Sequence, residues 1–185
     1  MRARVPADAP VMARTPGLVL AALILTLAGC SSTPPAPRVW QPPSPKVWGA
    51  AASSSDIASR LSPEQAGDVT LYAVGLVGTP YRYGGNTPAS GFDCSGLIGH
   101  VYQSRAGVVP PRTVAKLQSW GSVVTDAQVR SGDVVLFAQR DTVTHAGIYV
   151  GEGRFVHAPS TGGTVRLESL NARHWAAQRI TFRRP

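Results

Sequence analysis

The chain has 185 residues, of which 43% are hydrophobic, and it carries a formal net charge of +8 at pH 7. This length accommodates one domain of ordinary size together with shorter appendages. The positive charge favours an anionic cell wall or membrane surface as a neighbour. No basic run or aromatic ladder is present, which argues against a nucleic-acid-binding protein.

The first segment with a clear pattern is an apolar run at residues 18–27, preceded by three arginines. As a helix, this run would rise only about 15 Å, roughly half of a bilayer core, so a permanent membrane span is not expected. We therefore predict that residues 1–29 form an export signal. Translation from Met12 in place of Met1 would give a signal of more ordinary length.

Cys30 follows the apolar run directly, in the order Leu27-Ala28-Gly29-Cys30. This order resembles the lipobox of bacterial lipoproteins, in which the cysteine is acylated and becomes the mature N-terminus. The resemblance implies a lipid anchor on Cys30. The serine after it implies sorting to the outer membrane, facing the periplasm, in a cell with two membranes. The alternative is cleavage at Ala28 or Gly29 followed by free secretion.

Residues 30–61 contain several prolines and a serine cluster, without a sustained hydrophobic period. Such a composition predicts a disordered tether that extends at most about 3 Å per residue. The tether would hold a folded domain, residues 62–185, away from the membrane that anchors it.

Helical signals fill the first half of this domain. Ser62, Pro63 and Gln65 form a capping box with proline at the first helical position, which marks the start of a helix. Glycines close each helical pattern. The predicted helices are 63–78, 94–104 and 113–120.

The second half of the domain changes to the period of strands, interrupted by glycine-rich turns. The predicted strands are 134–137, 144–150, 155–157, 165–167 and 179–182, with a short helix over 171–177. Helices followed by strands with short connections predict an α+β domain in which the N-terminal helices pack on an antiparallel sheet of five to six strands.

Cys94 is placed at the first turn of the second helix, after a glycine-rich loop. Free N–H groups and the positive end of the helix dipole stabilise an anion there, so a lowered thiol pKa and a nucleophilic role are expected. The alternatives are a small buried hydrophobic residue or a disulfide with Cys30. If Cys30 carries lipid, Cys94 is a lone thiol in an oxidising compartment, and catalysis explains its presence.

A cysteine nucleophile needs a base and a group that orients the base. His100 lies on the same helix as Cys94, roughly 120° from the direction of the thiol, and cannot serve. His174 lies in a polar segment and is expected at the surface. His145 and His157 remain as the candidates for base and orienting group.

His145 and His157 lie on consecutive predicted strands joined by a tight turn, so antiparallel pairing would bring their rings together. Gly147 shares the face of His145 and leaves space for another backbone or for a substrate. The alternatives are structural histidines or a zinc site with Cys94. Metal-binding spacing and a convincing fourth ligand are missing, so no metal is expected.

Six short motifs extend over the C-terminal two-thirds of the chain. In this order, they resemble the NlpC family of papain-like cysteine peptidases, which cut bacterial cell-wall peptides. The resemblance implies a papain-like fold. The motifs are GTPYRYGG (78–85), DCSGLI (93–98), VPPRT (109–113), SGDVVLF (131–137), HAGIYVG (145–151) and FVHA (155–158).

The resemblance implies that Cys94 is the nucleophile, His145 the base and His157 the orienting third member of a Cys-His-His triad. It also implies that the Tyr81 hydroxyl lies near the nucleophile and helps to hold the oxyanion, with Tyr83 as the alternative. No metal or organic cofactor is required.

The implied substrate is peptidoglycan, cut by a DL- or DD-endopeptidase reaction in stem peptides or crosslinks. Arg112 and Thr113 lie where a carboxylate of a stem peptide would be met, or Arg112 is an ordinary surface charge. We expect a monomer. The competing functions are a non-catalytic wall-binding lipoprotein and an acyl-transfer enzyme on the same fold.

Overall fold

The computed structural model describes residue 46 and residues 59–160 and 162–185. The predicted export signal, the predicted lipidation site Cys30 and most of the predicted tether lie outside the described residues. Within the described part of the chain, no helix is both long and apolar enough to cross a membrane. This finding does not extend to the apolar run at 18–27.

The first helix begins as the capping box predicts. In α1 (Pro63–Gly75) the Ser62 side chain accepts a hydrogen bond from the Gln65 amide, and the Gln65 side chain accepts one from the Ser62 amide. The helix ends three residues before the predicted 78, because the chain turns there and Gly78 adopts a φ of 94°.

The other helices are α2 (Cys94–Ala106), α3 (Val114–Leu117) and α4 (Arg173–Ala176). Asp93 caps the start of α2, and Gly107 ends this helix with a φ of 66°. The third helix is shorter than predicted, because residues 118–121 continue as turns. The starts of α2 and α3 are thus each capped by a polar side chain, Asp93 and Thr113 respectively.

The strands form a six-stranded antiparallel sheet in the order β3-β8-β4-β5-β6-β7, so the predicted α+β class is confirmed. The sequence did not predict β3 or a separate hairpin made of β1 and β2. The bounds are β1 (Asn86–Thr87), β2 (Gly91–Phe92), β3 (Ser122–Val124), β4 (Val134–Gln139), β5 (Thr142–Gly151), β6 (Arg154–His157), β7 (Arg166–Ser169) and β8 (Arg179–Arg184).

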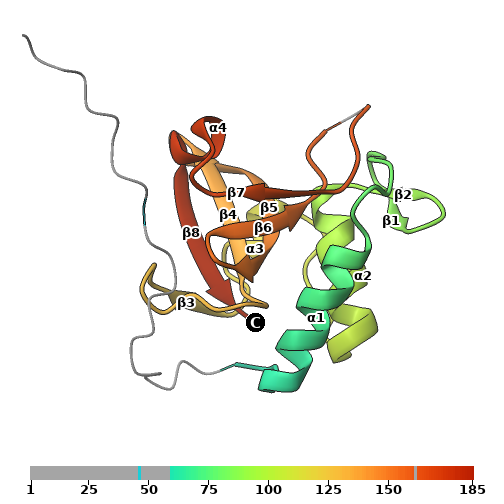
Figure 1. Cartoon of the computed structure of the whole chain (residues 1–185), viewed down its shortest axis with the longest axis horizontal. Coiled ribbons are helices and arrows are strands. Elements are labelled where there is room, and N and C mark those ends of the chain that lie inside the picture. The colour runs from blue at the N-terminus through green and yellow to red at the C-terminus, as the bar shows by residue number, and fades with distance from the viewer. Residues whose placement is uncertain (1–45, 47–58, 161) are drawn as a thin grey trace, which may run out of the picture. The chain divides into compact units, whose positions relative to one another are not determined.

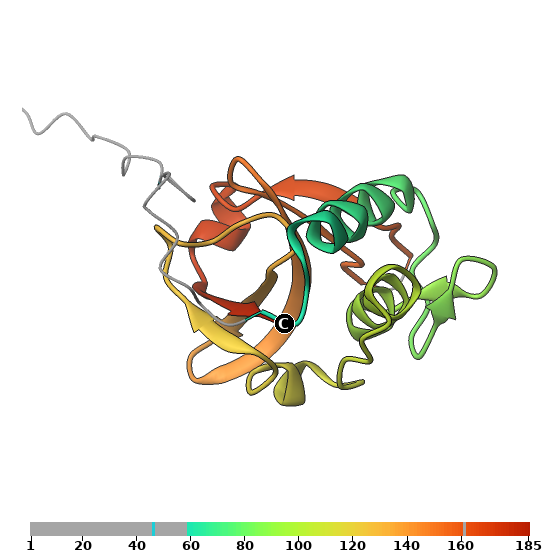
Figure 2. The same ribbon diagram turned by 90° about the horizontal axis from the view of Figure 1, so that it is seen from below.

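The sheet separates two hydrophobic cores. Helices α1 and α2 lie side by side against one side of the sheet (Figures 1 and 2). On β4, Val134 and Leu136 pack in the core shared with these helices, whereas Val135 and Phe137 pack in the second core together with Trp175 of α4. This division follows from the alternation of side chains along a strand.

A buried ion pair joins the last strand to the start of β4. Arg184 donates two hydrogen bonds of 2.9 Å to the Asp133 carboxylate and one of 2.7 Å to the Gln128 carbonyl. The two side chains are almost inaccessible to solvent, at 6% and 2% exposure. Bidentate geometry and additional partners are what a buried charge pair requires.

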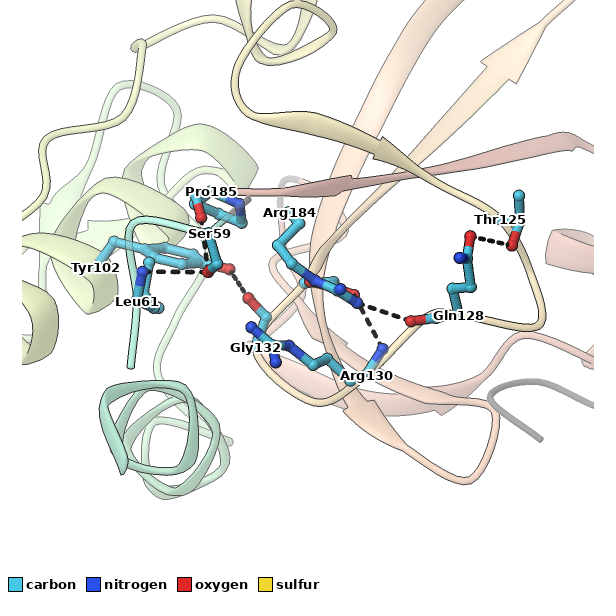
Figure 3. Close-up of polar contacts among 10 residues, drawn as sticks. Ser59, Leu61, Tyr102, Thr125, Gln128, Arg130, Gly132, Arg184 and Pro185 are labelled. Carbon is cyan, nitrogen blue, oxygen red and sulfur yellow. Dashed lines mark hydrogen bonds and ion pairs between the residues drawn. The ribbon is translucent and has the colours of Figure 1, made fainter. Parts of the chain in front are cut away.

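Packing onto the domain begins before residue 62. The Ser59 hydroxyl and the Arg60 amide both donate to the carbonyl of Pro185, at 3.0 and 2.7 Å, and Figure 3 shows Ser59 beside Pro185. Leu61 belongs to the core. These three residues, which we had expected in the tether, are thus held by the C-terminal residue and by hydrophobic burial, neither of which a composition-based boundary detects.

Candidate active site

The start of α2 is built by hydrogen bonds to the Asp93 carboxylate. Asp93 accepts from the amide of Gly96 at 2.6 Å and from the hydroxyl of Ser95 at 2.9 Å. Its second oxygen accepts from the amide of Gly84 at 2.9 Å. The carboxylate thus joins the preceding loop to the first helical turn and holds Cys94, the first residue of α2, in place.

Gly96 allows the loop to approach this turn. A Cβ atom at position 96 would lie only 1.9 Å from the carbonyl oxygen of Gly85, and 2.8 Å from the guanidinium of Arg112. Because the contact is with backbone, a larger residue would have to displace the loop or the helix. The glycine after the Cys94-Ser95 pair is therefore a steric requirement of the site.

Cys94 opens onto a cavity of about 420 Å³. Tyr81 and Arg112 lie in its wall, so the structure brings together the cysteine, the predicted rim tyrosine and the predicted carboxylate-binding position. Tyr83, the alternative to Tyr81, also lines the cavity but is 89% exposed. The lining residues are Tyr81, Tyr83, Gly84, Asp93, Cys94, Ser95, Arg112, Thr113 and Val114.

Burial changes the ionisation expected for Cys94. Desolvation, and then the negative charge of Asp93, raise the pKa of the thiol, while the backbone N–H groups of Ser95, Cys94 and Ala146 act in the opposite direction. The expectation that the helix start would lower the pKa of this thiol was therefore wrong. The N–H groups are present, but loss of hydration outweighs them.

His145 and His157 meet as predicted. The Nε2 atom of His145 and the Nδ1 atom of His157 are 2.8 Å apart, and both rings are buried. In the pairing of β5 with β6, Ile148 lies opposite Val156 and Tyr149 opposite Phe155. Both histidines lie on the same face of the sheet as Gly147, where a Cβ atom would come within 3.3 Å of the His157 Cβ. The space at Gly147 is thus occupied by β6.

The thiol lies close to β5, the strand that carries His145. The backbone N–H of Ala146, the residue after His145, acts on the Cys94 sulfur. Among the described residues, the sulfur forms no hydrogen bond with either imidazole ring. Catalytic hydrogen bonds are often long in a free enzyme and shorten when substrate binds.

Both histidines are neutral at ordinary pH. Desolvation is the main cause that lowers the pKa of His145 to about 3, and the neighbouring His157 adds to the effect. Desolvation, followed by the positive charge of Arg166, lowers the pKa of His157 to about 3. Two neutral rings can share one hydrogen bond, in which one nitrogen donates and the other accepts.

Aromatic side chains enclose the histidine pair. Trp175 stacks on the His145 ring with centroids 5.3 Å apart and planes inclined by 24°, and it meets the His157 ring edge-on at 5.0 Å. Phe137 and Phe155 contact the rings from the same core. This apolar surround explains the desolvation and restrains the ring orientations.

Two residues beside the histidines were missed by the sequence analysis. Trp175 donates a hydrogen bond from its indole Nε1 to the carboxylate of Glu168, and the same carboxylate oxygen lies 3.5 Å from the Nε2 atom of His157. The two come from α4 and β7. No motif connects them to the histidines, so no sequence signal would have identified them.

The other two histidines lie elsewhere, as predicted. His100 pairs with the hydroxyl of Tyr72 at 2.9 Å. His174 is exposed and contacts the side chain of Gln178. The part of the chain that the structure describes contains no group of three or more histidine, cysteine, aspartate or glutamate residues suited to hold a metal ion.

Comparison with known proteins places these features in a family. A profile described as the NlpC/P60 family matches residues 78–184. The murein DD-endopeptidase MepH of Escherichia coli K12 is 35% identical over 112 residues, which cover 58% of this chain and 41% of that protein. The gamma-DL-glutamyl hydrolase of Bacillus subtilis 168 is 38% identical over 110 residues, covering 58% of this chain and 26% of the relative. The chain thus spans less than half the length of these two relatives.

Solved structures agree with this assignment. An NlpC/P60 family protein from Bacillus cereus ATCC 10987 superposes with a TM-score of 0.62 at 28% identity, covering 70% of this chain and 41% of that one. The NlpC/p60 domain of the peptidoglycan hydrolase SagA gives a TM-score of 0.56 at 29% identity, covering 63% of this chain and 96% of that one. The family profile spans more than half of the sequence and includes Cys94, His145 and His157, and the chain belongs to the NlpC/P60 family.

Proposed function

We propose that the chain is a cysteine peptidase that hydrolyses amide bonds in the peptides of peptidoglycan. One observation carries the proposal: Cys94 opens onto a cavity beside the strand that bears His145, and His145 is hydrogen-bonded to His157. A thiol, a neutral imidazole and a second ring that orients the first are the elements of nucleophilic acyl transfer. The murein endopeptidase and glutamyl hydrolase activities of the relatives support this substrate class.

The ionisation of the site supports a mechanism in which thiol and base are both neutral before reaction. The Cys94 sulfur attacks the amide carbonyl while its proton passes to His145, since burial disfavours both separate charges. The backbone N–H of Cys94 at the helix start stabilises the oxyanion, with help from the Tyr81 hydroxyl.

His145 then protonates the departing amine, which leaves an acyl group on Cys94. A water molecule gives a proton to His145 and attacks the thioester, and the sulfur leaves and recovers the proton. His157 orients His145 through the 2.8 Å contact between the rings. Tyr81 is assigned the role at the rim because it lines the cavity onto which Cys94 opens. Desolvation, and then the neighbouring Cys94, raise the pKa of its hydroxyl.

The test is the release of soluble peptides from purified peptidoglycan by wild-type protein and by Cys94→Ala, with the melting temperature as the control for folding. We expect Cys94→Ala to lose release entirely and to keep its melting temperature. Release by a folded Cys94→Ala protein would refute the assignment. Mass spectrometry of the wild-type products identifies whether the DL or the DD bond is cut.

We further propose that Cys30 carries a lipid and that the tether beginning there places the catalytic domain at the outer membrane, facing the periplasm, as a monomer. The apolar run at 18–27 and the Leu-Ala-Gly-Cys order support the anchor. Labelling with a radioactive fatty acid and membrane fractionation test it. Wild-type protein should be labelled and sediment with membranes, whereas Cys30→Ser should be unlabelled. An unlabelled wild-type protein would refute the lipid anchor.

A further inference from the structure

The outer nitrogen of the histidine pair, the Nε2 atom of His157, lacks a hydrogen bond among the described residues. His157 is fully buried. Its Nδ1 atom is already engaged with His145. A buried polar atom without a partner is unfavourable, and in a functional site it calls for an explanation.

Glu168 faces this nitrogen. Its Oε2 atom lies 3.5 Å from the His157 Nε2 atom, and its side chain is 28% exposed. The indole N–H of Trp175 donates to the same oxygen. Because Trp175 also stacks on His145, the tryptophan links the position of the carboxylate to the position of the base.

The location of the proton on His157 determines which nitrogen of His145 is free. If His157 carries its proton on Nε2, its Nδ1 atom accepts from His145, and the Nδ1 atom of His145 keeps a lone pair for the thiol. If His157 carries the proton on Nδ1, His145 must accept with Nε2 and carry its own proton on Nδ1. Only the first arrangement makes His145 a base on its Nδ1 side.

We propose that Glu168 is a positioning residue that attracts the proton of His157 to Nε2 and thereby sets the tautomers of both rings. A carboxylate can only accept a hydrogen bond, so it selects the N–H form of the nitrogen that it faces. This inference rests on the proposed function for its catalytic consequence, but the tautomers can be measured without any activity.

The charges around Glu168 agree with this role. Arg166 lies opposite His157 in the pairing of β6 with β7, and its guanidinium is 3.7 Å from the other oxygen of Glu168. Arg166 and His174 disfavour positive charge on His157. The negative charge of Glu168 acts in the opposite direction on His145, so during the reaction it favours the positive charge that His145 gains.

The experiment combines tautomer measurement with kinetics. Protein labelled with ¹⁵N-histidine distinguishes Nδ1–H from Nε2–H in each ring by NMR. The variants are Glu168→Ala, which removes the acceptor, and Glu168→Gln, which keeps an acceptor oxygen without the charge. Glu152→Gln is the matched control, because Glu152 is exposed on the β5–β6 turn and its carboxylate pairs with the side chain of Arg154.

In wild-type protein, we expect the Nε2–H form in both His145 and His157. Glu168→Ala should lose this preference and lower kcat at least about tenfold without a matching change in KM, since a base in the wrong tautomer cannot accept the proton. Glu168→Gln should keep the tautomers and recover part of kcat, and Glu152→Gln should match the wild type.

An Nδ1–H form of His157 in the wild-type protein would overturn the proposal, even if Glu168→Ala does not fold. Unchanged tautomers and kcat in a folded Glu168→Ala protein would also overturn it. Retained hydrolysis by Cys94→Ala would instead refute the proposed function and leave the NMR result intact, so the two failures can be told apart.

Discussion

Gly147→Ala tests whether the close approach of β6 to β5 holds the catalytic geometry. A Cβ atom at position 147 would lie 2.9 Å from the carbonyl oxygen of Val156, 2.8 Å from a ring carbon of Phe155 and 3.3 Å from the Cβ of His157. Gly147 also lies opposite Val135 on β4, so β5 is held on its other side. The added methyl group must therefore push β6 away from β5.

The magnitude follows from these distances. To restore ordinary carbon–oxygen contact, β6 must move by about half an ångström, and such overpacking costs about 1–3 kcal/mol in the free energy of unfolding. The same movement lengthens the 2.8 Å contact between His145 and His157. If a misplacement of 1 Å lowers the rate roughly a hundredfold, we expect a loss of about tenfold in kcat/KM.

The assay measures thermal unfolding and peptide release for Gly147→Ala beside a matched control, Gly67→Ala. Gly67 lies within α1, and nothing lies within 4 Å of a Cβ atom placed there. Alanine at that position should stabilise the protein by about 0.5–1 kcal/mol and leave activity unchanged. A Gly147→Ala protein with wild-type melting temperature and activity would show that the strand spacing does not position His157.

Three further predictions concern ionisation and the buried ion pair. Because burial raises the pKa of Cys94, alkylation of its thiol by iodoacetamide should accelerate as pH rises beyond about 9, and a plateau between about pH 5 and pH 8 would contradict a neutral thiol. Burial lowers the pKa of His145 and of His157 in the folded protein to about 3, from the ordinary 6.5 of a histidine. The stability that they contribute should therefore be complete above about pH 6.5 and be lost progressively as pH falls towards 3. Denaturant unfolding at a series of pH values should show this loss. If replacing both histidines with glutamine left the pH dependence of the unfolding free energy unchanged, the histidines would not be its cause. Finally, Asp133→Ala leaves Arg184 buried without its partner and should lower the free energy of unfolding by about 3–5 kcal/mol. A measured loss below about 1 kcal/mol would contradict this prediction.

The sequence was sufficient wherever a local pattern has a single physical outcome. The Ser62-Pro63-Gln65 capping box predicted where α1 begins, because each of its bonds is made within one turn. Gly107 predicted the end of α2, because a left-handed residue is needed there. The order of helices and strands predicted an α+β domain with an antiparallel sheet. The turn between β5 and β6 predicted that His145 and His157 would meet.

Short strands and the first part of the domain were beyond such reasoning. The three residues of β3 pair with β8, about sixty positions further along the chain, with Ser122 opposite Arg184. The sequence around Ser122 contains no pattern that predicts this pairing. Ser59 was assigned to the tether by composition, yet it is held by the carbonyl of Pro185. In each case the stabilising bond comes from a distant residue.

The features of the candidate active site also fall into those that the sequence predicts and those that only the folded structure shows. The sequence alone indicated Cys94 at a helix start and selected two histidines out of four. Only the tertiary structure decided that desolvation outweighs the helix start and raises the pKa of the thiol, and only it brought Glu168 of β7 and Trp175 of α4 to the outer nitrogen of His157. Local bonds follow from neighbouring residues, whereas burial and the field of charges depend on every element packed around a group, and these exist only once the chain has folded.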